Sequence, residues 1–165
     1  MKRFSCRTKN RKSIAAAVVM ISVMFAFQVT FAAMQSGRVI GISHQMTGEI
    51  FMTVSAEPGD SLSFGWEHSF EHVVWNEYYT IQEDGTFHLD SIAVAGFGAG
   101  IPAEMDCNYR YEKGLVYMED IKGSAFPEFN WIHSHTQLKW IRLNDQELLA
   151  GEDLPQGEKI NLCVK

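Results

Sequence analysis

The chain has 165 residues, with 14 basic and 20 acidic side chains and a formal net charge of −6. Six of the basic residues fall within the first twelve positions, so the part after residue 33 holds eight basic and all 20 acidic side chains, a net charge of −12. A domain of this charge repels phosphate backbones and anionic lipid heads, which argues against nucleic-acid binding and against direct binding to a membrane surface.

The first 33 residues have the pattern of an export segment. A basic stretch leads into an apolar run from Ile14 to Ala33, as the n-region of a signal peptide leads into its h-region. Thr30 and Ala32 would suit a small-residue cleavage site, but an apolar helix of about 20 residues can also span a bilayer. Residues 1–33 are therefore predicted to be a signal peptide or a signal anchor. Residues 34–165 form one extracytoplasmic β domain, in the periplasm or at the cell surface, that meets the membrane only through this segment.

The exported part is predicted to be all-β. It shows short stretches of period-2 alternation separated by turn residues, and no helical periodicity over ten or more residues. Seven or eight strands of this kind predict a single small β-sandwich or open barrel. The expected strands and hairpins cover residues 49–54, 61–67, 73–81, 86–94, 109–120, 131–143 and 159–164.

One hairpin can be predicted with its register. Glu83-Asp84-Gly85 has the sequence of a three-residue loop that ends with glycine in the left-handed conformation. With that loop, Ile81 faces Phe87, Tyr79 faces Leu89 and Glu77 faces Ser91, which places apolar side chains opposite each other at the first two pairs.

Glu77 is the polar residue that most needs an explanation, because alternation places it between Trp75 and Tyr79 on an apolar face. A buried carboxylate is costly unless it is hydrogen-bonded or neutralised. Its candidate partners are His68, the hydroxyl of Ser69, and the backbone N–H groups of the 96–100 loop. If the strands at 61–67 and 73–81 form a direct hairpin with His68 opposite Val73, however, Phe64 rather than His68 faces Glu77.

These residues allow two interpretations. The cluster is either a buried polar pair that fixes the fold or a pocket that binds a ligand or partner. The candidate binding residues are His68, Ser69, Glu77, Gly96, Gly98 and Gly100.

Catalytic and metal sites find less support in the sequence. Neighbouring strand residues point to opposite faces, so His68 is poorly placed to deprotonate Ser69. His133 and His135 on one strand would present two imidazoles on one face, but no motif supplies a third ligand. We therefore assign no catalytic residue, no metal ligand and no cofactor.

Two cysteines, Cys107 and Cys163, lie in the exported part. An even number of cysteines in an oxidising compartment predicts one disulfide between them. The alternative is two unpaired buried thiols.

Several elements occur together in the order of a known family: His68-Ser69 at the end of a strand, Glu77 on the next, Gly98-Ala99-Gly100-Ile101-Pro102 after a hairpin, and a late Pro-x-Gly turn. With them, most of residues 48–165 resembles a prokaryotic domain of unknown function whose genes lie beside, or are fused to, those of TAXI-type TRAP transporters. The resemblance implies no catalytic activity. It implies the transporter permease or its solute receptor as a partner, and it gives no support to a site at residues 133–135 or at the cysteines.

Two hypotheses follow for the function. The first is a non-catalytic extracytoplasmic accessory or binding protein linked to a TAXI-type TRAP solute-uptake system. The second is a small metal-dependent or acid/base enzyme that uses His68 and Glu77.

We predict that the exported part folds without residues 1–33, because the strand pattern begins after them and needs no apolar helix as a packing partner. A chain starting at Gln35 should be soluble and should unfold in one cooperative transition when followed by circular dichroism. Aggregation of every chain that begins near this residue would show that the boundary is wrong.

Overall fold

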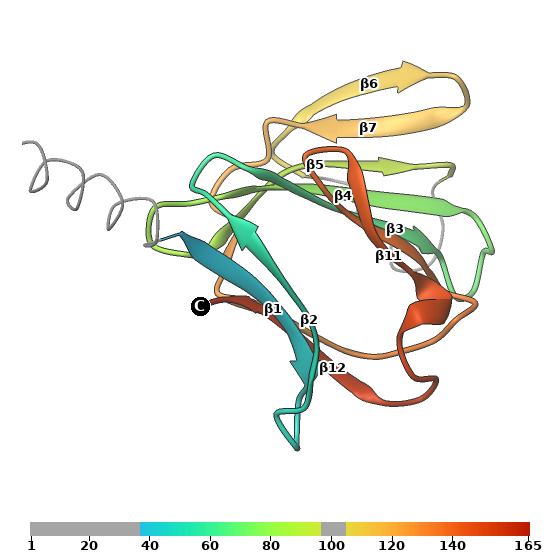
Figure 1. Ribbon diagram of the computed structural model, residues 1–165. Helices are drawn as coiled ribbons and strands as arrows, with labels where there is room; N and C mark the ends of the chain where they lie inside the picture. Colours follow the sequence, from blue (N-terminus) through green and yellow to red (C-terminus); the bar gives the residue numbers. More distant parts are fainter. Residues whose placement is uncertain (1–36, 97–104) are drawn as a thin grey trace, which may run out of the picture. The chain divides into compact units, whose positions relative to one another are not determined.

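The computed structural model describes residues 37–96 and 105–165, and residues 38–165 form one compact unit. Of the described residues, 59% lie in strands, and these strands form two antiparallel sheets that do not close into a barrel. The predicted all-β class is confirmed, in the form of a sandwich (Figure 1). Gly98 and Gly100, and the N-terminal segment 1–33, lie outside the described residues.

The smaller sheet has four strands, and the two central ones contribute aliphatic side chains to the core. Its two central strands carry Ile40, Ile42, Ile160 and Leu162, all of them fully buried. The strands follow the order β2 (Ile50–Ala56), β1 (Arg38–His44), β12 (Lys159–Val164) and β9 (Glu128–Ile132).

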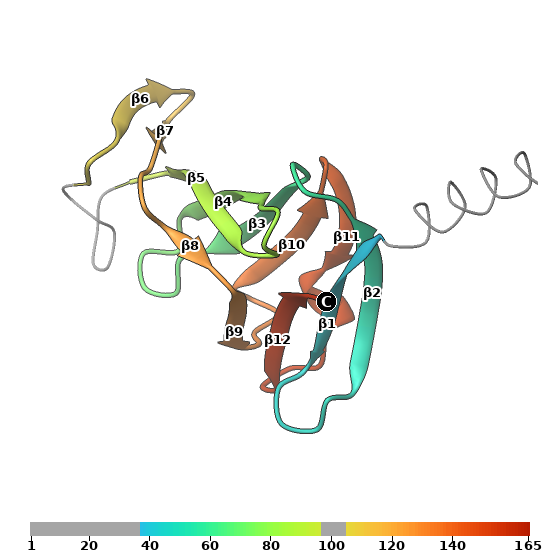
Figure 2. The same ribbon diagram turned by 90° about the vertical axis from the view of Figure 1, so that its left-hand side faces the viewer.

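The larger sheet has eight strands. A short strand, β8 (Ala125–Phe126), pairs with β5 beside the main path. At one edge the β6–β7 hairpin projects from the body of the domain (Figure 2), and every residue of β6 is exposed. The main path follows the order β11 (Gln146–Ala150), β10 (Leu138–Leu143), β3 (Ser61–Glu67), β4 (Val74–Ile81), β5 (Phe87–Val94), β7 (Leu115–Glu119) and β6 (Asn108–Glu112).

The predicted β4–β5 hairpin forms, with one difference in register. The amide of Gln82 donates to the Thr86 carbonyl at 2.8 Å, and Gly85 has φ +84°. Ile81 pairs with Phe87 and Tyr79 with Leu89 as predicted, but Glu77 pairs with Ile92 instead of Ser91. A β-bulge causes the shift, because Tyr78 pairs with Ser91 while its neighbour Tyr79 pairs with Leu89, which leaves Asp90 as the extra residue on β5.

The described residues form twelve strands, more than the seven or eight expected. The expected strands omit β1, in which the fully buried Ile40 and Ile42 alternate with Gly41 and Ser43. Glycine and serine are also common in turns, so this short pattern does not by itself indicate a strand. Strand β8 and the first part of β9 lie between the expected ranges 109–120 and 131–143, where no strand was predicted. Residues 131–143, expected as one strand, belong to two: β9 ends at Ile132, and β10 begins at Leu138.

The structure does not contain the predicted disulfide, since Cys107 and Cys163 are both free thiols. Cys107 packs against the hydrophobic core. Cys163 follows the buried Leu162 on β12, so alternation turns it toward the outer face of the smaller sheet. An even cysteine count gives no information on where each thiol lies in the fold, and here one packs against the core while the other lies on the outer face of a sheet.

The two sheets meet through an aromatic cluster centred on Phe129 of β9. Its ring lies 5.1 Å from that of Phe64 on β3, 4.8 Å from Tyr79 on β4 and 4.9 Å from Phe87 on β5, measured between centroids. Close aromatic pairs of this kind stabilise a core beyond the area that they bury. A single side chain of the smaller sheet therefore contacts three strands of the larger one.

The short 3-10 turn η1 (Gly151–Asp153) begins with a glycine, and this glycine gives a test of how closely η1 packs against β10. A Cβ at Gly151 would overlap the carbonyl oxygen of Leu138, which is backbone and cannot move aside. Gly151→Ala is expected to lower the free energy of unfolding by about 2–3 kcal/mol in urea titrations. Gly41→Ala is the control, because its Cβ would meet only the flexible side chain of Lys165, and it should stay within about 0.5 kcal/mol of wild type. Equal changes in the free energy of unfolding for the two substitutions would contradict the close contact between Gly151 and the Leu138 carbonyl.

Candidate functional site

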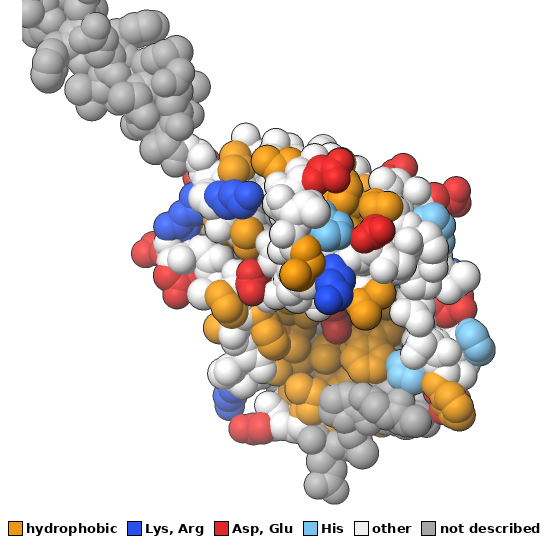
Figure 3. All heavy atoms as spheres, turned by 90° about the horizontal axis from the view of Figure 1, so that it is seen from below, with side chains coloured by type: hydrophobic (Ala, Val, Ile, Leu, Met, Phe, Trp, Pro, Cys, Tyr) orange, Lys and Arg blue, Asp and Glu red, His pale blue; other side chains and the backbone are white. Residues whose placement is uncertain are grey.

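A small pocket lies where β3 ends and β4 begins. It has a volume of about 220 Å³ and is lined by Trp66, His68, Trp75 and Glu77. Figure 3 shows a hollow on one face of the domain where hydrophobic side chains gather, with an acidic side chain inside it. The hairpin register brings the lining together, because Trp66 pairs directly with Trp75 and the His68 amide donates to the Val73 carbonyl at 2.8 Å.

The two tryptophans of this pair hold the Glu77 carboxylate. The indole N–H of Trp66 donates to Oε2 and that of Trp75 donates to Oε1, both at 3.1 Å. Each carboxylate oxygen therefore accepts one hydrogen bond, and the plane of the group is fixed. Buried indole N–H groups need an acceptor, so the arrangement satisfies both sides.

Burial raises the pKa of the Glu77 carboxyl above its ordinary value of 4.5, although contacts with Trp66, Trp75 and Tyr79 work in the opposite direction. Burial, with the nearby Glu77 carboxylate as a second cause, also raises the pKa of Tyr79. Among the described residues, Glu77 makes no ion pair. The carboxylate thus sits in a poorly solvated place with hydrogen-bond donors but no countercharge.

His68 lies in the pocket wall and makes no hydrogen bond with Glu77. Its ring stacks on Trp75 at 5.6 Å between centroids, and its Nδ1 accepts the backbone N–H of Glu71 at 3.1 Å. The side chain opposite Glu77 on β3 is Phe64, as expected for a direct hairpin. With Nδ1 acting as an acceptor, the neutral ring carries its proton on Nε2.

Of the other predicted binding residues, Ser69 and Gly96 do not line this pocket, and Gly98 and Gly100 lie outside the described residues. Ser69 is exposed in the turn between β3 and β4, and Gly96 is half-buried at the end of the first described range. Of the partners expected for Glu77, neither His68 nor Ser69 is used. The indole donors were not predicted, because alternation identifies Trp66 and Trp75 only as apolar residues. The signal that the sequence offers is the presence of two tryptophans on the same face as an inward carboxylate, and it does not say where their N–H groups point.

His133 and His135 have a structural role in the connection between β9 and β10. Their Nε2 atoms lie 2.7 Å from the Gly151 carbonyl and 2.8 Å from the Leu154 carbonyl, and both rings must donate there because a carbonyl only accepts. Burial lowers the pKa of His133. Within the described ranges, no three His, Cys, Asp or Glu side chains gather closely enough to hold a metal ion.

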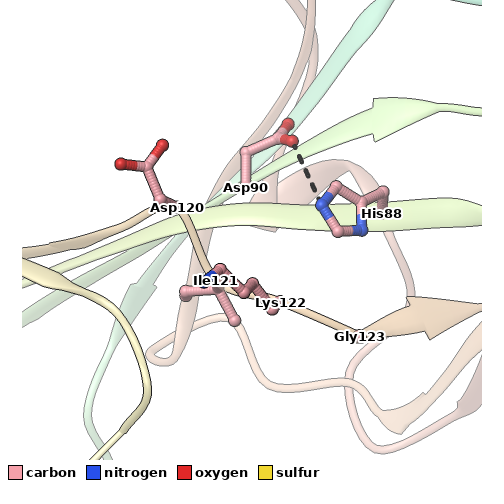
Figure 4. Close-up of a pocket in the computed structure, with 6 residues that line it drawn as sticks. All are labelled: His88, Asp90, Asp120, Ile121, Lys122 and Gly123. Carbon is pink, nitrogen blue, oxygen red and sulfur yellow. Dashed lines mark ion pairs between the residues drawn. The ribbon is translucent and has the colours of Figure 1, made fainter.

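A second pocket, of about 410 Å³, lies beside β5 and β7 (Figure 4). His88 and Asp90 project from β5 and form a long ion pair of 3.9 Å, while the Asp120 carboxylate points away from them. Asp90 also accepts a hydrogen bond from the Thr80 hydroxyl at 2.6 Å. The Asp120 carboxylate accepts a hydrogen bond from the side-chain amide of Asn108. Both acidic groups of this pocket thus have partners within the fold, and we regard the Glu77 pocket as the better candidate site.

The fold and the pocket define the class of protein: a β-sandwich domain with a carboxylate held inside an aromatic pocket. The sequence matches the family described as Domain of unknown function (DUF1850) over residues 62–148. The chain belongs to this family, and the matched region includes all four residues of the pocket. Comparisons with curated proteins and with solved structures find no match. No helix in residues 37–96 or 105–165 is both long and apolar enough to cross a membrane.

The raised pKa of Glu77 gives a pH-dependent stability that can be measured. The folded state keeps the Glu77 proton to higher pH than the unfolded state does, so stability falls as pH rises from 4.5 through the raised pKa. Relative to Glu77→Gln, the wild type should therefore lose stability over this range in thermal or urea unfolding. Parallel curves for the two proteins would contradict the burial of the carboxylate.

Glu67→Gln is the control, because the pKa of Glu67 is shifted in the opposite direction to that of Glu77. Hydrogen bonds to Lys139 and then His72 lower the pKa of Glu67 below 4.5, so its contribution is lost as pH falls.

Proposed function

We propose that the chain is a non-catalytic extracytoplasmic accessory or binding protein linked to a TAXI-type TRAP solute-uptake system. The pattern of residues 1–33 supports export, as a signal peptide or signal anchor. The resemblance of the exported part supports the link to transport, with the permease or its solute receptor as the partner. In this proposal the membrane is reached only through the N-terminal segment.

The observation that carries the binding role is the Glu77 carboxylate, fixed by two indole donors in a pocket with aromatic walls. Binding sites are mostly apolar hollows with a few polar groups in fixed orientations, and this pocket has that composition. Because the donors already hold the carboxylate in place, a ligand would not have to order it.

The same pocket gives less support to a catalytic role. Ser69 is exposed in the turn, and no hydrogen bond joins His68 to Glu77, so the described residues contain no activated hydroxyl in this pocket. Recognition needs only the carboxylate and the rings.

One observation favours the alternative, a small acid/base or metal-dependent enzyme. Burial raises the pKa of Glu77, and His68 lines the same pocket, so two titratable groups face one space. Metal analysis of protein purified without an affinity tag separates the two proposals, because stoichiometric zinc would favour the enzyme.

Co-purification tests the transport proposal. The full chain, tagged at its C-terminus and extracted from its native membranes in mild detergent, is expected to enrich the permease or the solute receptor of a TAXI-type TRAP system. Quantitative mass spectrometry measures the enrichment against an unrelated exported protein with the same tag. If neither component is enriched although both are expressed, the link to transport fails.

A further inference from the structure

The Glu77 carboxylate lacks a countercharge within the described part of the fold. Every ion pair among those residues involves other carboxylates, and the seven basic residues that take part lie outside the lining of this pocket. A negative charge that is partly removed from water is stabilised most by a nearby cation. In this place the described fold provides only neutral groups, the two indole donors and the nearby Tyr79, and it leaves the charge itself uncompensated.

The carboxylate also keeps capacity for further hydrogen bonds. An ionised carboxylate has about four lone-pair sites on its two oxygens. One site on each oxygen accepts an indole N–H, at 3.1 Å in both cases. A ligand with N–H donors can therefore bind to Glu77 without displacing Trp66 or Trp75.

The rest of the lining fits an organic cation better than a hydrated metal ion. Aromatic rings attract cations through the negative charge of their faces, and Trp66 and Trp75 supply such rings in the lining. The apolar surface also favours a carbon-bearing ligand. At about 220 Å³, the pocket is smaller than the roughly 300–1,000 Å³ of drug-sized sites, so it suits a small molecule or the charged end of a larger one.

We propose that this pocket binds the ammonium or guanidinium head of a small organic cation, with Glu77 as the countercharge and the rings of Trp66 and Trp75 as its walls. The inference rests on the proposed binding function and names its ligand class. Charge-assisted hydrogen bonds to the carboxylate give the head group its orientation. The aromatic lining selects against a strongly hydrated inorganic cation.

The experiment uses the full chain in mild detergent at neutral pH, with n-butylammonium and ethylguanidinium chloride as probes. Butyramide is the neutral counterpart, sodium butyrate the anionic one, and sodium chloride matches the ionic strength. Tryptophan fluorescence reports binding, because two indoles line the pocket, and the unfolding temperature reports stabilisation by mass action. At least one cation is expected to bind saturably and to raise the unfolding temperature, while butyramide and sodium chloride do neither.

Two variants locate the binding. Glu77→Gln keeps the shape of the side chain and removes its charge, and it should weaken cation binding at least about tenfold. Glu71→Gln is the matched control, because Glu71 is exposed in the adjacent turn and lies outside the lining. It removes one negative charge near the pocket and should change the affinity by no more than about twofold.

Equal binding of butyramide would overturn the proposal, because the pocket would then be only apolar. Binding of butyrate in place of the cations would also overturn it, and so would the absence of any saturable signal. If Glu77→Gln does not fold, the comparison of the cations with butyramide and butyrate on the wild-type protein still tests the proposal. A chain that captures its TRAP partner but binds no cation would refute this inference alone, whereas cation binding without that partner would refute only the link to transport.

Discussion

The contact of Phe129 with the larger sheet joins the two layers of the sandwich. Strand β9 lies at the edge of the smaller sheet, and through this ring it reaches Phe64, Tyr79 and Phe87 on three consecutive strands of the other. Two sheets form a stable sandwich only if their inner faces interlock. The next inward residue on β9, Trp131, continues the contact to Phe64 and Trp66 at 6.3 and 6.1 Å. The packing that joins the sheets thereby also supports one wall of the Glu77 pocket.

Glu77 is the exception to this apolar packing, and its environment balances two opposing effects. Partial removal from water disfavours the ionised form, while the indole donors favour it, and the raised pKa shows that removal from water is the larger effect. The tryptophans nevertheless gain from the arrangement, because their N–H groups would otherwise lack acceptors in a half-buried place. The result is a carboxylate with a fixed orientation and an incomplete set of partners, which is unusual for a residue with a purely structural role.

Local patterns in the sequence predicted the strands around this site and their hairpins. Alternation identified residues 61–67 and most of 74–81, and the loop at Glu83 to Gly85 fixed the first pairs of the next hairpin. The pattern did not reveal the bulge at Asp90, because one extra residue changes the pairing beyond it without changing the local composition. The partners of Glu77 were missed for a related reason: which way an indole N–H points depends on the rotamer and on the opposite strand, and composition carries neither.

The return of the chain from β9 into the larger sheet explains how the pocket wall is kept in place. His133 is buried immediately after β9, donates from Nε2 to the Gly151 carbonyl, and presents Nδ1 to the Trp131 indole N–H at 3.4 Å. Both ring nitrogens are therefore used, and only the neutral ring with its proton on Nε2 fits this arrangement. A protonated ring would place a donor against the Trp131 N–H, and burial, which lowers the pKa of His133, favours the same neutral form. Since Trp131 packs against Trp66, this buried histidine holds a ring of the pocket in place without lining the pocket itself.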